Sequence, residues 1–579
     1  MHRATPSIVW AIWAAMFVAL LVLVARFGSN VPSWDEWDLV PALTGHQPVT
    51  AEWLWSQHNE HRVPLPRLVL LALNAFGRID FRIGQVQNAS ALAAVAALLI
   101  LAVRRARDGR TILADALFPL VLLHPRHAVN VLWGWQFQFV ASAALACVIL
   151  GSIARGSSRP ARGALFTAGI ALCLLPLCGA NGVALVPALA LWLAYVAYVA
   201  LRAGERARAL AAGATAMVSL ALVGRYFVGF EEVPNYALGS TFSATAEEAV
   251  RFFAAGFGPT FRGSWPLSGV AAVLALLATT ALLLWTIRYR PEERARALGL
   301  ASFLAAMGSL ALGLGFGGRY GFQARYVTLA APAWCAAHLV WAICPSPAWL
   351  PRSLGPSALA LAALASFHPN LQSGLEHARD LRTHLAAFEH DVAAGEPPYR
   401  LVARHGRYLH PHHELLSDYM PMLRAAGVGA FAELRDDPPF VEIPIRLDAL
   451  SIEQCTIDGD TIRATGGIPE IVLALPAAER VAGFRLRCAY RSLQPGLPCI
   501  ALYWHGGGAE AGFGKRYYMF SPTGDRATWE RNSWSRRSEA EITLTCWIDE
   551  PATHLRLHPD YKPCELRIRE LVMLVAPRP

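Results

Sequence analysis

Hydrophobic runs recur along the first 367 residues of this 579-residue chain, and they constrain its fold more than any other feature. A helix needs roughly 20 consecutive apolar residues to cross the hydrocarbon core of a bilayer. The pattern therefore predicts a polytopic α-helical membrane protein with about eleven transmembrane helices. The runs lie near residues 8–27, 84–103, 112–124, 129–152, 163–178, 182–201, 209–228, 267–287, 297–315, 327–344 and 353–367.

The composition agrees with a membrane protein. Hydrophobic residues make up 55% of the chain and charged residues only 16%, whereas soluble domains carry roughly 25% charged residues. The first run, 8–25, is longer than the apolar region of a signal peptide and is not followed by a small-residue cleavage site, so we expect a retained membrane helix.

Arginine clusters predict the topology. They follow the second, fourth, sixth and eighth runs and begin at Arg104, Arg155, Arg202 and Arg288. Short loops rich in Lys and Arg face the cytoplasm. The N-terminus is therefore expected inside, and loops 28–83, 229–266 and 316–326, with everything after the last run, outside. The net charge of +9 is therefore explained by arginines that set the topology in a lipid bilayer. They form no patch typical of nucleic-acid binding, so no nucleic-acid partner is expected.

The polar C-terminal part divides in two. Residues 368–439 carry apolar side chains at helical spacing, and residues 440–579 alternate apolar and polar side chains between turn signals. We predict three regions: a transmembrane domain over 1–367, a helical extracytoplasmic linker over 368–439, and an extracytoplasmic β-sandwich over 440–579. The expected location is a bacterial inner membrane.

The first outside loop opens with three carboxylates, Asp35, Glu36 and Asp38. One of them could act as a general base toward an acceptor hydroxyl. Alternatively, Asp35 and Asp38 could help to hold a divalent ion through oxygen ligands. A third interpretation is a solvated loop in which Trp34 and Trp37 mark the membrane interface.

The same loop closes with His58, Glu60, His61 and Arg62. On a helix, the two histidines would share one face and could suit a metal. The run lacks the His-Glu-x-x-His pattern of zinc proteases, and no third ligand is evident. We therefore expect a polar cluster that binds substrate hydroxyls or anions, with Arg62 able to approach a phosphate.

A third candidate lies in the glycine-rich loop 315–326, which contains Arg319, Arg325 and Tyr326. Arginines in an outside loop run against the positive-inside trend, and ionisable groups at this boundary are functional candidates. Their planar guanidinium groups suit a phosphate leaving group. Alternatively, these side chains extend to lipid headgroups.

Taken together, these features resemble the GT-C superfamily of membrane glycosyltransferases. The shared features are a cytoplasmic N-terminus, about eleven spans, a first outside loop opening with Asp35-Glu36, and a C-terminal outside domain. The superfamily includes protein O-mannosyltransferases and the lipid A aminoarabinose transferase. The resemblance implies that Asp35 is the base, that Glu36 is its motif partner, and that the segment from Arg319 to Tyr326 contacts the lipid phosphate of a polyprenyl-phosphate sugar.

The expected function is inverting transfer of a sugar from a polyprenyl-phosphate donor to an extracytoplasmic glycan, lipid or protein. No cofactor is expected, and a divalent metal is not indicated. The alternatives are a transporter or flippase for lipid-linked saccharides, and a non-catalytic scaffold. A structure in which Asp35 and Arg319 line one outward-facing cavity would support transfer, whereas distant positions would favour the alternatives.

Overall fold

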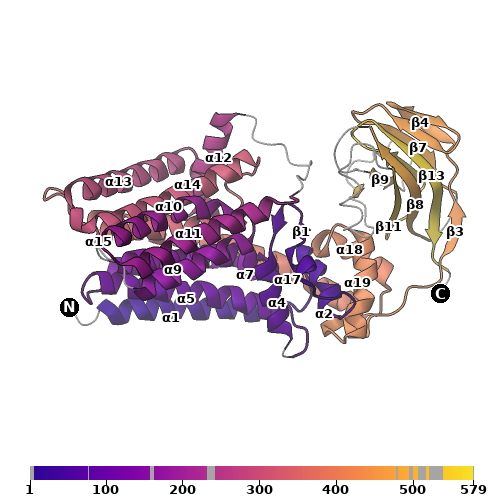
Figure 1. Ribbon diagram of the computed structural model, residues 1–579. Coiled ribbons are helices and arrows are strands. Elements are labelled where there is room, and N and C mark those ends of the chain that lie inside the picture. Colours follow the sequence, from indigo (N-terminus) through magenta and orange to yellow (C-terminus); the bar gives the residue numbers. More distant parts are fainter. Residues whose placement is uncertain are drawn as a thin grey trace.

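The computed structural model describes residues 5–75, 77–156, 162–230, 241–476, 480–493, 500–505, 517–520 and 539–577. It shows a long helical bundle that contains the N-terminus and a separate β-rich region that contains the C-terminus (Figure 1). A smaller group of helices lies between the two.

Eight helices of the described chain are long and apolar enough to cross a membrane. Their hydrophobic side chains form one large core in which small residues such as Ala89, Ala96 and Ala306 are fully buried, as expected where helices approach closely in a bilayer. The eight are α1 (Thr5–Phe27), α5 (Arg82–Ala106), α8 (Phe137–Arg155), α10 (Ala180–Arg202), α11 (Arg206–Phe227), α13 (Leu267–Tyr289), α14 (Arg294–Phe316) and α15 (Val327–Ile343).

The predicted count of about eleven spans is not confirmed, because three of the apolar runs form shorter helices. Run 112–124 forms a 3₁₀ turn over Leu113–Ala116 and the six-residue α6 (Leu117–Leu122). Helix α6 ends just before His124-Pro125, where proline disfavours helical geometry in the preceding residue. Run 163–178 forms α9 (Arg162–Leu174) and a tighter turn that contains Pro176. Run 353–367 forms the 12-residue α16 (Leu354–Ala365).

Short elements form the connections between several of the long helices. They include a 3₁₀ segment over Trp34–Leu39 and a two-stranded hairpin. These short elements are α2 (Val40–Leu43), α3 (Ala51–Trp55), β1 (Gln57–His58), β2 (His61–Arg62), α4 (Pro64–Asn74), α7 (Ala128–Val131) and α12 (Phe242–Ala255).

Three helices follow the bundle: α17 (Phe367–Ala393), α18 (Pro398–Leu409) and α19 (His413–Ala425). They share a hydrophobic core with the first loop, in which the buried Trp37 ring meets Phe431 edge-on at 5.7 Å between centroids. Trp37 is fully buried, so it anchors the acidic loop rather than marking a membrane interface.

The β-rich region contains two antiparallel sheets with one shared apolar core. One sheet has the strand order β10-β9-β12-β7-β4, and the other has the order β11-β8-β13-β6-β5, with β3 paired to β13. The strands are β3 (Val441–Pro444), β4 (Ala449–Glu453), β5 (Cys455–Asp458), β6 (Thr461–Ala464), β7 (Glu470–Ala474), β8 (Val481–Ser492), β9 (Ile500–His505), β10 (Tyr517–Phe520), β11 (Glu539–Trp547), β12 (His554–His558) and β13 (Cys564–Val575).

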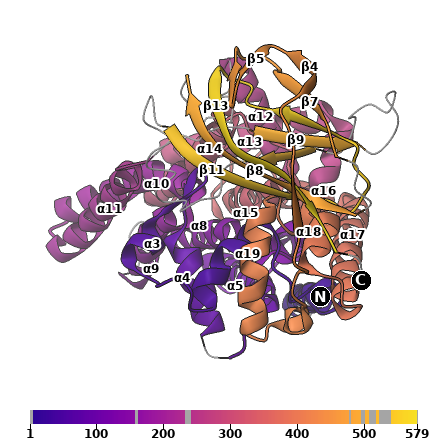
Figure 2. The ribbon, with the colours of Figure 1, turned by 90° about the vertical axis from the view of Figure 1, so that its right-hand side faces the viewer.

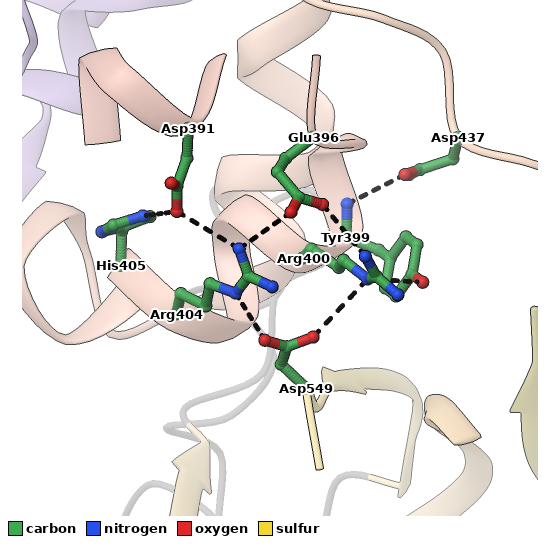
Figure 3. A network of polar contacts seen from close by, with 8 residues as sticks. All are labelled: Asp391, Glu396, Tyr399, Arg400, Arg404, His405, Asp437 and Asp549. Carbon is green, nitrogen blue, oxygen red and sulfur yellow. Dashed lines mark hydrogen bonds and ion pairs between the residues drawn. The ribbon is translucent and has the colours of Figure 1, made fainter. Parts of the chain in front are cut away.

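The end of β11 joins the sheets to α18 and α19, which lie beneath them in Figure 2. The Trp547 backbone N–H donates to Nδ1 of His413 at 3.1 Å. Beyond it, Asp549 pairs with Arg400 at 3.5 Å and also with Arg404 (Figure 3). Buried packing and charge therefore act together at this contact.

Candidate active site

A cavity of about 520 Å³ brings together side chains that are far apart in the sequence. Its size lies within the range of roughly 300–1,000 Å³ that is usual for small-molecule sites. It is lined by Asp35, His58, Asn59, Glu60, His61, Gln136, Gln138, Phe139, Ala180, Asn181, Ala184, Phe230, Leu310, Gly313, Leu314, Gly317, Arg319, Arg325 and Tyr326. Seven of the ten residues predicted from the sequence line this one cavity; Glu36, Asp38 and Arg62 do not.

His58 lies between two carboxylates at one side of the cavity. Its Nε2 is 3.4 Å from Asp35 Oδ1, and its Nδ1 is 2.8 Å from Asp38 Oδ2. Burial alone would lower the pKa of His58, but the two carboxylates outweigh burial and raise it. Burial likewise opposes ionisation of Asp35, yet His58 holds the pKa of Asp35 below its ordinary value. The arrangement is a buried imidazole flanked by two carboxylates, which favour its protonated form.

The two histidines of the run are cross-strand partners, not neighbours on a helix. His58 on β1 faces His61 on β2 across the turn Asn59-Glu60. Asn59 adopts a positive φ of 49°, which asparagine tolerates better than most residues. The prediction that His58 and His61 share one face of a helix is therefore wrong, because a two-residue turn reverses the chain between them. Within the described chain, no three His, Cys, Asp or Glu side chains are placed to hold a metal ion.

His61 has a different environment from His58. Burial, followed by the charges of His58 and Arg325, lowers the pKa of His61 to about 4. The ring is therefore neutral at pH 7, and its Nδ1 has no hydrogen-bond partner among the described residues.

Glu36 holds the acidic loop in place. It is buried, and its Oε2 accepts a hydrogen bond from the Ser33 N–H at 2.9 Å. Burial raises the pKa of Glu36 to about 8, although the backbone N–H groups of Ser33, Gly134 and Trp135 oppose that shift. The carboxyl group thus ties the loop to the segment that begins α8. Asp38 faces His58 from outside the cavity lining.

Two arginines supply the positive side of the cavity. Arg319 forms an ion pair with Glu60. Arg325 donates from Nε to Gln323 Oε1 at 2.8 Å and lies over the Tyr326 ring, with its Cζ 5.4 Å from the centroid. Burial and the neighbouring Arg325 lower the pKa of Arg319.

Arg62 lies outside the cavity lining, contrary to the predicted phosphate contact. Its guanidinium donates to the carbonyl oxygens of Trp55 at 2.9 Å, Tyr226 at 3.1 Å and Gly229 at 2.6 Å. Unpaired carbonyls accumulate at the C-terminal end of a helix, and Arg62 satisfies those at the end of α11.

The structure adds residues that the sequence interpretation missed. Gln136 lines the cavity from the 3₁₀ turn that precedes α8, and Gln138 and Asn181 line it from the first turns of α8 and α10. Polar amides inside apolar runs or directly beside them were a usable signal, since such groups are costly in a membrane unless they serve a purpose. His410, which follows α18, lies near enough to Asp35 to help lower the pKa of that carboxyl. No sequence signal linked these two positions.

No protein-family model matches the chain, and no curated protein matches it. Among solved structures, the chain is similar over its whole length to the arabinosyltransferase EmbB from Mycobacterium smegmatis, with 12% identity and a TM-score of 0.25, and it spans 65% of that protein. Part of the chain, 41%, is similar to 34% of a family GH115 4-O-methyl-alpha-glucuronidase, with 11% identity and a TM-score of 0.13. Neither likeness is close enough to carry an argument about this chain, so the cavity is the basis for its function.

Proposed function

We propose that this chain is a GT-C-type membrane glycosyltransferase that moves a sugar from a polyprenyl-phosphate donor to an extracytoplasmic glycan, lipid or protein. One observation carries the proposal: Asp35, Arg319 and Arg325 line the same cavity. In the sequence, Asp35 lies near the start of the membrane region and the two arginines lie near its end. An acidic group for the acceptor and cationic groups for the phosphate are the two requirements of this reaction.

In the proposed reaction, the acceptor hydroxyl oxygen attacks the anomeric carbon from the face opposite the phosphate. The bond between that carbon and the phosphate oxygen breaks, and the electron pair leaves with the phosphate. The proton of the hydroxyl passes to Asp35 as the new bond forms. A single displacement of this kind inverts the anomeric configuration. His58 is a positioning residue, because it keeps Asp35 ionised and oriented.

Arg325 is the better candidate for the departing phosphate. Its planar guanidinium can pair with two phosphate oxygens, and its positive charge is held in the cavity beside Tyr326. Arg319 already pairs with Glu60. For Arg319 to join, the phosphate must compete with that carboxylate.

The base assignment is tested by Asp35→Asn in the purified full chain, reconstituted with a panel of polyprenyl-phosphate sugars and candidate acceptors. Loss of a positioned base typically costs about 10²- to 10⁴-fold in rate, so product should fall by at least about 100-fold. Asp108→Asn is the matched control, because Asp108 is exposed and lies beyond the far end of α5.

A fully active Asp35→Asn protein would refute the base assignment. A wild-type protein that moves the lipid-linked sugar across the bilayer without forming product would instead identify a transporter. A wild-type protein that neither transfers nor moves the sugar would favour a scaffold.

We also propose a cytoplasmic N-terminus and an extracytoplasmic cavity and β-rich region in a bacterial inner membrane. The support is geometric. Helix α5 begins near the cavity loops and runs 25 residues to its arginine-rich end, a distance of about 37 Å. The arginines therefore lie at the opposite end of the bundle from the cavity.

Cysteine labelling tests this topology. In intact spheroplasts, a membrane-impermeant maleimide should modify Val49→Cys in the cavity loop and leave Arg110→Cys unmodified, although both positions are exposed in the fold. Permeabilised cells should label both. The reverse pattern in intact spheroplasts would invert the proposed orientation.

A further inference from the structure

Three buried amide side chains line the cavity with polar atoms that no described residue satisfies. Gln136 is 1% exposed, Gln138 4% and Asn181 3%. The atoms without a partner are Oε1 of Gln136, Oε1 of Gln138 and Nδ2 of Asn181. A buried polar atom that makes no hydrogen bond destabilises the fold, because it has lost its water without gaining a partner. Three such atoms around one cavity indicate hydrogen bonds that a ligand would complete.

The two glutamines lie between the acidic and cationic sides of the cavity. One residue before Gln136, the Trp135 ring meets His58 at 4.9 Å between centroids. One residue after Gln138, the Phe139 ring lies 6.1 Å from the Tyr326 ring. The segment Trp135–Phe139 therefore runs from the proposed base to the proposed phosphate site. The group that joins acceptor to phosphate in the reaction is the transferred sugar.

Asn181 approaches the same space from a second helix. It follows Gly179, which has a φ of +107° and begins the turn into α10. A Cβ at Gly179 would lie 3.8 Å from both Gln138 Oε1 and the His61 Cβ. These are ordinary contact distances, so it is the positive φ that favours glycine at this position, and this φ turns the chain into α10 beside Gln138 and the hairpin.

The wall formed by these groups carries no net charge. The three amides are neutral at any ordinary pH, and the lowered pKa of His61 makes its ring neutral at pH 7. Neutral amides donate to and accept from hydroxyl groups equally well. The charged groups of the same cavity already have partners or an assigned role: Arg319 pairs with Glu60, and Asp35 pairs with His58. Arg325 is assigned to the phosphate. A carboxylate or an ammonium on the sugar would therefore have to compete with one of these pairs to regain the solvation that it loses against the amide wall.

We propose that Gln136, Gln138 and Asn181 bind the hydroxyl groups of the transferred sugar and select an uncharged pentosyl or hexosyl group. This inference rests on the proposed function for the identity of the lipid-linked donor. It assigns the three amides as specificity-determining residues and excludes uronosyl and aminosugar donors.

The test measures binding instead of turnover. The purified full chain in nanodiscs is titrated with bare polyprenyl phosphate and with its neutral hexosyl, neutral pentosyl and uronosyl esters. At least one neutral ester should bind tighter than the bare lipid by roughly tenfold or more, and the uronosyl ester should not. Gln138→Leu and Asn181→Leu should each remove most of that gain while leaving the affinity for bare polyprenyl phosphate unchanged.

Two controls separate the sugar contacts from other effects. Gln85→Leu is the matched substitution, because Gln85 Oε1 is also buried and has no partner in the described part of the chain, but lies outside the cavity lining. The gain should survive in that variant. Arg325→Gln should weaken all four ligands together. Unchanged binding of bare polyprenyl phosphate shows that each leucine variant is folded, and the two variants lie on different helices.

The outcomes distinguish this inference from the proposed function. A gain that persists in both leucine variants, or an equal gain for the uronosyl ester, overturns the sugar wall even if transfer is observed. A gain that both variants abolish supports the wall even if the wild-type protein forms no transfer product.

Discussion

At the scale of single residues, the cavity depends on one imidazole held between two carboxylates. His58 approaches Asp35 at 3.4 Å and Asp38 at 2.8 Å, so it neutralises a cluster that would otherwise repel itself. The three carboxylates of the loop thereby acquire different roles. Asp35 faces the cavity, Asp38 fixes His58, and Glu36 fixes the loop to α8.

This arrangement predicts the pH dependence of transfer. The folded pKa of Asp35 is below its ordinary 3.8, so the stabilising effect of the pair is present above that value and is lost as pH falls through the lowered pKa. The folded pKa of His58 is above its ordinary 6.5, so its contribution is complete below 6.5 and is lost as pH rises through the raised pKa. Between these two limits Asp35 stays ionised and His58 stays protonated. We therefore expect kcat/KM for sugar transfer to be independent of pH in that range.

His58→Gln should change that profile in a defined way. Without the imidazolium, burial is the largest influence on Asp35 and raises its pKa, so the acid limb of kcat/KM should move to higher pH. The alkaline limb that His58 causes should disappear. An acid limb at the same pH in wild type and His58→Gln would show that the pair does not control the base.

At the scale of elements, the hairpin β1-β2 positions two of the histidines and Glu60, and Arg62 fixes the hairpin. The backbone N–H of Arg62 donates to the Tyr226 hydroxyl at 3.2 Å, while its guanidinium binds carbonyls beyond the end of α11. Arg62 was predicted to contact substrate, but its hydrogen bonds hold the hairpin that carries His58, Glu60 and His61 against the end of α11.

Arg62→Lys should destabilise the protein without altering the chemistry. A lysine ammonium cannot reproduce the planar fork that reaches several carbonyls at once, and losing two such bonds should cost about 2 kcal/mol. The melting temperature in detergent, followed by tryptophan fluorescence, should fall relative to wild type, with KM for the donor unchanged at low temperature.

Arg78→Lys, an exposed position in the same loop region, is the matched control and should melt as wild type does. If Arg62→Lys kept its melting temperature but bound the donor more weakly, Arg62 would be a substrate contact after all.

At the scale of the whole molecule, the β-rich region is attached through buried aromatic packing as well as charge. The Trp547 ring lies 5.1 Å from Phe440 and 5.9 Å from Tyr399, and its Nε1 donates to Ser417 Oγ at 2.8 Å. Asp549, with its side chain 26% exposed, pairs with Arg400 and Arg404 (Figure 3). The packing should dominate, because partly exposed ion pairs contribute little.

Trp547→Ala should therefore loosen the β-rich region far more than Asp549→Asn. Removing a buried tryptophan costs about 3–5 kcal/mol, whereas the exposed pairs contribute about 1 kcal/mol or less. Hydrogen exchange of α18 and α19 should rise strongly in Trp547→Ala and slightly in Asp549→Asn. A rise in exchange for Asp549→Asn as large as the rise for Trp547→Ala would show that the charge network contributes as much as the packing.

Much of the helical region follows from local patterns, and its exceptions have local causes. Of the apolar runs that predicted about eleven spans, eight form the long helices, because the length of an apolar run is a local property of the sequence. The break before Pro125 and the turn at Pro176 were also visible as prolines. The hairpin at Asn59 was not predicted, since histidine spacing alone does not distinguish a helix from a two-residue turn.

The sequence by itself determined that this chain builds an apolar helical bundle followed by a polar region rich in strands, and it identified Asp35, Glu60, Arg319 and Arg325 as candidates. Only the tertiary structure decided which candidates share a cavity. It placed Glu36, Asp38 and Arg62 outside the lining and added Gln136, Gln138 and Asn181. The reason is physical. Composition and the spacing of apolar residues indicate which side chains are buried. A site, in contrast, depends on which helix ends and loops, distant in the sequence, come together in space.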